Sequence, residues 1–250
     1  SAIAAKIDFQ NTATASRRAP GFENTDSTDR GGSWTFLPWT EKEVNSIAPM
    51  LTAAGLQPAV RSGFAATEEF FKTVGAPSPR ILHIATHGYF FPDPKQTVDG
   101  GRQTVDGGRW TAGGEEPVYK MSEHPMIRSG LLLAGANHAW ETGKPIKPGM
   151  EDGILTAYEI SQMDLSNTEL VVLSACETGL GDIQGNEGVY GLQRAFKIAG
   201  AKYLIMSLWQ VPDFQTQELM TTFYQKWLTD KMTIPDAFQA AQQLMRAKYE

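Results

Sequence analysis

The chain has 250 residues, of which 41% are hydrophobic, and this is enough for one large domain with a sizeable core. Its formal net charge of -6 argues against nucleic acid or an anionic membrane as a partner, because both need a basic face. No apolar stretch reaches the roughly 20 residues that span a bilayer, and the amino terminus lacks a signal-peptide pattern. A single cysteine cannot form an internal disulfide, so we expect a cytoplasmic protein.

The first third of the chain predicts alternating strands and helices. Residues 1–9 predict a strand, and the polar residues 10–33 predict a long loop. Thr40 is the expected N-cap residue of a helix that ends at Gly55 and buries one apolar face. Residues 57–61 predict a strand, and Thr67 caps a helix expected to end at Gly75. This order predicts a parallel sheet with right-handed crossovers.

The middle of the chain alternates buried runs with long irregular stretches. Residues 80–86 predict a buried strand that ends at His87 and Gly88. Residues 89–129 predict a long loop, which contains the perfect repeat QTVDGGR at 96–102 and 103–109. Two copies are too few for a solenoid, so we interpret the repeat as a tolerated surface insertion. The apolar run 130–137 is expected at a sheet edge or in a hairpin, and residues 154–160 predict a short helix.

The last third predicts strands and helices again, and no linker divides the chain. The expected elements are a buried strand at 170–175, a helix at 187–200 that Gly200 ends, a strand at 202–208, and helices at 213–228 and 234–249. In the final helix, Ala237, Ala240, Ala241, Leu244 and Met245 are expected to face inward. We therefore expect residues 1–250 to form a single α/β domain.

Cys176 follows the buried run of residues 170–175, and His87 follows the buried run of residues 80–86. The carboxyl ends of parallel strands collect ligands and chemistry, so Cys176 is a candidate nucleophile and His87 a candidate base. An imidazole or the backbone N–H groups of the turn after Cys176 would favour the thiolate, and such N–H groups could also hold an oxyanion. The alternative is an inert thiol in the core.

The other histidines do not suggest a metal site. His83 lies four strand residues before His87, roughly 13 Å away, so it is expected in the core or behind the site. His124 and His138 are expected in loops, and no group of residues has zinc-like spacing. The glycines after Cys176 match neither phosphate-binding pattern. We expect no metal, nucleotide or other cofactor.

Acidic residues cluster after the cysteine, at Glu177, Asp182, Glu187 and Asp213. Solvated loop and capping carboxylates are the ordinary interpretation of such residues. Asp213 follows a predicted strand, so it could bind a basic group of a substrate or cap the helix that begins there, and the cap is slightly favoured.

Six ordered segments together resemble a CHAT domain, the caspase-like peptidase domain often attached to TPR repeats in bacteria. They are ILHIATHGYF at 81–90, RSGLLLAGAN at 128–137, GILTAYEIS at 153–161, ELVVLSACETGLGD at 169–182, EGVYGLQRAFKIAGA at 187–201 and MSLWQVPD at 206–213. The resemblance runs from about Pro38 to the end of the chain.

The resemblance implies a caspase-like fold, in which a mostly parallel sheet carries helices on both faces and a Cys–His dyad at adjacent strand ends. Carried over by position, His87 is the general base, Cys176 the nucleophile, and the backbone N–H groups of Gly88 and Cys176 the oxyanion hole. A stretch shared with separases makes Asp213 a candidate for the substrate pocket, with Glu177 and Asp182 as further candidates. Ser174 stands where some relatives carry a pocket acid.

We therefore expect a cysteine endopeptidase that cleaves a specific protein partner and is regulated by a fused TPR region, another partner or self-cleavage. One alternative is a catalytically silent scaffold that binds proteins with the same surface. Another is a cysteine-dependent acyl hydrolase or amidase that acts on small molecules.

Overall fold

The fold is taken from a computed structural model that describes residues 2–6, 34–74, 77–91, 122, 124–174, 187–207 and 212–249, with backbone only for 2–6 and 187–190. The expected loop at 10–33, the QTVDGGR repeat and Gly75 lie outside these residues. In the described part of the chain, no helix is both long and apolar enough to cross a membrane.

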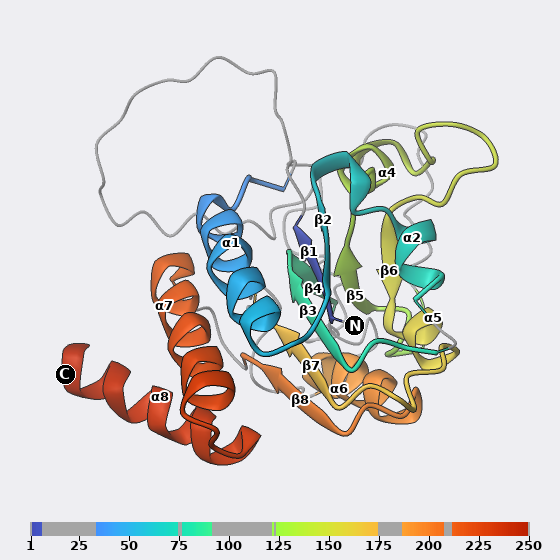
Figure 1. The fold of residues 1–250 in the computed structure, drawn as a ribbon. Coiled ribbons are helices and arrows are strands. Elements are labelled where there is room, and N and C mark those ends of the chain that lie inside the picture. Colours follow the sequence, from blue (N-terminus) through green and yellow to red (C-terminus); the bar gives the residue numbers. More distant parts are fainter. Residues whose placement is uncertain are drawn as a thin grey trace, which may run out of the picture.

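A five-stranded parallel sheet forms the centre of the molecule, in the order β2-β1-β3-β7-β8 (Figure 1). Its strands are β1 (Ala2–Lys6), β2 (Pro58–Ser62), β3 (Ile81–Ala85), β7 (Leu170–Leu173) and β8 (Tyr203–Met206). All described residues of β3 and β7 are buried, as expected for central strands covered on both faces. The sequence predicted these five strands and their parallel pairing correctly.

Helices cover both faces of this sheet (Figure 1). One face carries α1 (Pro38–Ala53), α7 (Asp213–Tyr224), the π-helical turn η3 (Gln225–Thr229) and α8 (Ile234–Tyr249). The other face packs against α2 (Glu68–Lys72), α5 (Ala157–Ser161) and α6 (Glu187–Ile198), and the 3-10 turn η1 (Gly63–Ala65) precedes α2.

Side chains of β3 alternate between these two layers, as the two-residue period of a strand requires. Ile81 joins the apolar cluster of α1, α7 and α8, whereas Leu82 and Ile84 join the cluster of α2, α5 and α6. His83 therefore faces α1 and α7, and its contacts are described with the site.

A second, antiparallel sheet of order β4-β5-β6 adjoins the carboxyl end of β3. Its strands are β4 (Gly88–Phe90), β5 (Ser129–Leu132) and β6 (Ile154–Thr156), and α4 (Ala136–Thr142) follows β5. Three predictions need correction here. The loop expected at 89–129 has strands at both ends, and the helix expected at 154–160 begins as a strand. Of the two alternatives for the run at 130–137, the sheet edge is wrong, because β5 is a central strand that pairs antiparallel with both β4 and β6.

Two predictions about helices are also wrong. Helix α1 begins at Pro38 instead of after Thr40, because the fixed φ of proline suits the first helical position and its missing N–H needs no partner there. The Thr40 hydroxyl donates to the Leu37 carbonyl from inside the helix, at 2.7 Å. In α8, Leu244 is 51% exposed, because only the face with Ala237 and Ala241 packs against the neighbouring helix layer.

Candidate functional site

His87 lies where the chain leaves the parallel sheet and enters the antiparallel one. Strand β3 ends at Ala85, and β4 starts at Gly88. The Leu132 N–H donates to the His87 carbonyl at 2.9 Å, and the Thr86 hydroxyl donates to the Leu132 carbonyl at 2.5 Å. The junction is thus fixed to β5, which holds the backbone on both sides of His87 in one position.

The His87 side chain is fully buried, and the segment before α1 contacts its ring. His87 Nε2 lies 2.6 Å from the Thr35 carbonyl oxygen. A carbonyl oxygen only accepts hydrogen bonds, so this contact places a proton on Nε2 and makes Nδ1 the basic nitrogen of the neutral ring. The Trp34 ring packs beside the imidazole, with centroids 5.1 Å apart.

Strand β7, which lies beside β3, leads toward the cysteine. The ladder between them continues to Ser174, whose N–H donates to the Ile84 carbonyl at 3.1 Å. Ser174 is buried, with 4% of its surface exposed. Cys176, Glu177 and Asp182 follow in residues 175–186, which lie outside the described residues.

The side chains of Asp213 and His87 interact electrostatically. Burial raises the pKa of the Asp213 carboxyl above its ordinary value, and the charge of Glu43 raises it further, whereas the Trp39 N–H and His87 lower it. The expected helix cap is wrong. Pro212 is the N-cap residue of α7, and Asp213 Oδ2 instead accepts the Trp39 N–H from the first turn of α1 at 3.0 Å.

His83 belongs to a buried polar cluster beneath the site, in line with its expected place in the core. Its Nε2 lies 2.9 Å from Glu43 Oε1 on α1, a contact that is an ion pair only when the imidazole is protonated. Its Nδ1 lies 3.2 Å from the Tyr224 hydroxyl at the end of α7. Ser174 Oγ lies 3.5 Å from His83 Nε2. The cluster joins α1, α7 and the end of β7.

Burial raises the pKa of the Tyr224 hydroxyl well above its ordinary value, and the nearby Glu43 charge raises it further. Tyr224 therefore stays neutral and acts as a hydrogen-bonding group rather than a charge. Removing one member of such a cluster would leave buried polar atoms unpaired, which is usually strongly destabilising.

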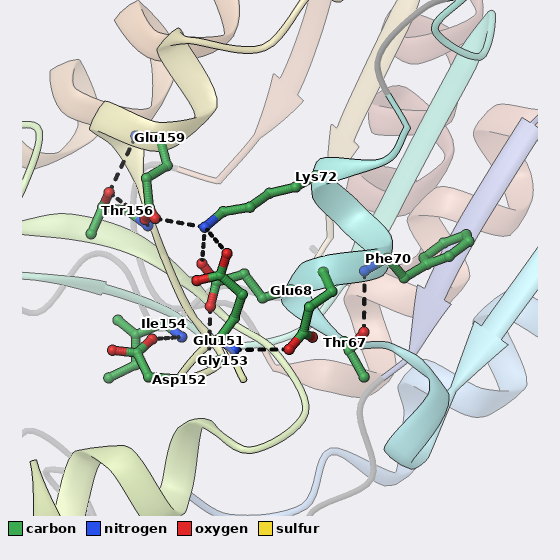
Figure 2. A network of polar contacts seen from close by, with 11 residues as sticks. Thr67, Glu68, Phe70, Lys72, Glu151, Asp152, Gly153, Ile154, Thr156 and Glu159 are labelled. Carbon is green, nitrogen blue, oxygen red and sulfur yellow. Dashed lines mark hydrogen bonds and ion pairs between the residues drawn. The ribbon is translucent and has the colours of Figure 1, made fainter. Parts of the chain in front are cut away.

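A second polar cluster lies at α2 (Figure 2). Helix α2 packs on the opposite face of the sheet from His83. Oxygens of Glu68, Glu151 and Glu159 lie within 4.8 Å of one another, a spacing that would suit a metal ion. Figure 2 shows the Lys72 ammonium among them, and its Nζ lies 2.8 to 2.9 Å from each carboxylate. Lys72 already occupies the place between the three carboxylates and pairs with each of them, so we assign the cluster to structure.

No sequence pattern pointed to Thr35, Trp34 or Glu43. The structure places Thr35 and Trp34 against His87, and Glu43 against His83. Glu43 carried one usable signal, because it occurs on the same helical face as Val44 and Ile47, which are apolar and buried. An acid on a buried face needs a partner, and His83 is that partner. Thr35 contributes a backbone carbonyl, so its side chain could give no signal.

One of three comparisons with known proteins gave a match. A family model described as CHAT domain matches residues 4–250 of the chain. The search of curated proteins and the search of solved structures returned no match.

Proposed function

The chain belongs to the CHAT domain family, and from this membership we propose that it is a cysteine endopeptidase that cleaves a specific protein partner. In this proposal Cys176 is the nucleophile and His87 the general base. The family is related to cysteine peptidases, and the α/β architecture with helices on both sheet faces is consistent with a caspase-like fold.

The observation that carries the proposal is the register between β3 and β7. Their paired residues differ by 89 in residue number, from Ile81 with Leu170 to Ile84 with Leu173. His87 and Cys176 follow these strands and differ by the same number. Neighbouring parallel strands with this register favour an imidazole and a thiol at adjacent strand ends, which a Cys–His dyad requires.

The tautomer of His87 suits the role of base. With the Nε2 proton donated to the Thr35 carbonyl, Nδ1 takes the proton from Cys176 Sγ. The thiolate then attacks the scissile carbonyl carbon, and the carbonyl electron pair moves to the oxygen. When the oxyanion collapses, the C–N bond breaks and the His87 proton passes to the leaving amine. A water molecule, deprotonated by His87, hydrolyses the thioester and regenerates the thiol.

The oxyanion hole is proposed from the backbone N–H groups of Gly88 and Cys176. Gly88 directly follows His87, is buried, and is the first residue of β4. A backbone donor beside the base is in a suitable place to stabilise negative charge on the substrate oxygen, and each such donor typically contributes about 100-fold or more to kcat.

Asp213 is the proposed pocket residue, with Glu177 and Asp182 as further candidates. Its carboxylate is half-buried near His87, where a substrate side chain next to the scissile bond would lie. Such an acid would favour a basic substrate residue. Asp213→Asn keeps an oxygen that can accept the Trp39 N–H and removes the charge, so it should reduce this preference without unfolding the chain.

Cleavage of a peptide library and of candidate protein partners tests the proposal. The parent should cleave after few, defined residues, and Cys176→Ala and His87→Ala should each lose this activity by at least about 1,000-fold, as is typical for members of a catalytic group. Retained cleavage by either variant would reject the dyad. A parent that binds partners without cleaving them would support the scaffold alternative, and hydrolysis of simple esters or amides alone would support the small-molecule alternative.

A further inference from the structure

Asn137, the second residue of α4, holds the segment that contacts His87. Its side-chain oxygen accepts the backbone N–H of Trp34 at 2.8 Å, and its side-chain nitrogen donates to the Trp34 carbonyl at 3.1 Å. One side chain thus pairs with both polar groups of a single residue 103 positions away. The side-chain amide of Asn137 thus hydrogen-bonds the Trp34 backbone as the backbone of a neighbouring β-strand would.

The fixed residue Trp34 leads directly to the contact with His87. Its ring packs against the imidazole at 5.1 Å and edge-on against Trp140 of α4, also at 5.1 Å. The carbonyl of the next residue, Thr35, receives the hydrogen bond from His87 Nε2 at 2.6 Å. A displacement of the Trp34 backbone would therefore move the Thr35 carbonyl away from the ring.

We propose that Asn137 is a positioning residue for His87, which keeps the ring in the tautomer with the proton on Nε2 through the backbone of Trp34 and Thr35. The kinetic part of this inference rests on the proposed function, whereas the tautomer does not. Asparagine is specific here because it offers one acceptor and two donors, and aspartate offers acceptors only when ionised.

The chemistry explains why the tautomer matters. If the Thr35 carbonyl moves away, the ring proton can reside on either nitrogen. A ring with its proton on Nδ1 has no lone pair there to accept the proton of Cys176. Only part of the molecules would then have the tautomer with a free lone pair on Nδ1, and the ring would also lose its fixed orientation.

Two variants and a control test this role. Asn137→Ala removes both hydrogen bonds, and Asn137→Asp keeps an acceptor for the Trp34 N–H but sets a carboxylate oxygen against the Trp34 carbonyl. Thr142→Ala is the matched control, because Thr142 lies on the same helix, is exposed, and bonds only within α4 and its following turn. Circular dichroism establishes that each variant is folded.

The first readout is the ¹⁵N spectrum of the histidine rings at a pH where His87 is neutral, with His87→Gln identifying its signals among the four histidines. The parent and Thr142→Ala should show the proton on Nε2. Asn137→Ala should show a mixture of the two tautomers, and Asn137→Asp a mixture or the other tautomer. Unchanged His87 signals in a folded Asn137 variant overturn the inference. Should Asn137→Ala fail to fold, Asn137→Asp decides.

The second readout is the rate of Cys176 alkylation. A misplacement of about 1 Å can cost about 100-fold in rate, so a loss of about tenfold is expected in Asn137→Ala and none in Thr142→Ala. A loss of less than about twofold in folded Asn137→Ala would overturn the kinetic part. If His87→Ala alkylates as fast as the parent, the proposed dyad fails, and the tautomer readout still decides the role of Asn137.

Discussion

The charges around Lys72 illustrate how one residue's protonation depends on its neighbours. Burial lowers the pKa of Lys72, but its hydrogen bonds to Glu159, Glu68 and Glu151 raise it well above its ordinary value. Burial raises the pKa of Glu68 to about 7, against the lowering effect of Lys72. The pKa values of both partners, Lys72 and Glu68, are therefore raised, and the two shifts are compatible. One ammonium is shared among three carboxylates, so Lys72 stays charged and the most buried acid takes up a proton first.

This shift predicts how stability depends on pH. The pKa of Glu68 rises from 4.5 to about 7 on folding. The stabilisation of the folded protein by this shift is therefore complete below pH 4.5 and is lost as the pH rises through about 7. One pKa unit corresponds to about 1.4 kcal/mol, so up to about 3 kcal/mol is at stake. Glu68→Gln, which cannot titrate, should therefore gain stability relative to the parent as the pH rises from 5 to 8.

Urea unfolding of both proteins at several pH values measures this difference. Glu69→Gln is a suitable control, because Glu69 is a partly exposed neighbour whose pKa is lowered by backbone hydrogen bonds, first its own and then that of Glu151. Parallel pH profiles for the parent and Glu68→Gln would show that Glu68 does not titrate near neutrality in the folded protein.

At the scale of elements, the contact between α6 and β5 links the two sheets. Gly191 on α6 faces Ser129 on β5, and a Cβ atom at position 191 would lie 2.0 Å from Ser129 Oγ and 3.0 Å from Ser129 Cβ. The helix can approach the strand this closely only because residue 191 lacks a side chain. Helix α6 follows Cys176 in the sequence, so this contact fixes the position of the helix that comes after the cysteine.

Gly191→Ala should destabilise the protein, although alanine favours a helix over glycine by about 1 kcal/mol. Overpacking of a tight contact typically costs about 1 to 3 kcal/mol, so the net loss should be up to about 2 kcal/mol. Adding Ser129→Ala, which removes the nearest atom, should restore part of the loss. Thermal unfolding measures both, and a Gly191→Ala variant as stable as the parent would show that α6 shifts away at little cost.

At the scale of the whole molecule, the sequence predicted the parallel sheet because its strands are continuous apolar runs, such as Leu170–Leu173, that can be recognised locally. Strands β4 and β6 have three residues each, which is too short for a periodic pattern, and only their pairing with β5 defines them. The predicted helix cap at Thr40 failed because Pro38 begins the helix earlier.

In the candidate site, as in the fold, residues that follow a local sequence pattern were predictable and long-range contacts were not. His87 was identified because it follows a buried strand, which is a local feature of the sequence. Its partner Thr35 and the supporting residue Asn137 depend on contacts across 52 and 103 positions, which no local pattern encodes. The position of Asp213 beside α1 likewise depends on the packing of helices distant in sequence, through its bond to Trp39.

In the proposed dyad His87 activates Cys176, and the labelling rate of this cysteine, the only one in the sequence, tests that role without any knowledge of the substrate. A free thiol has a pKa of about 8.5 and is mostly protonated at pH 6.5, whereas an adjacent imidazole favours the thiolate. Iodoacetamide should therefore label the parent faster than a free cysteine at pH 6.5, and His87→Ala should be at least about tenfold slower. Equal, slow labelling of the parent and His87→Ala would contradict the dyad.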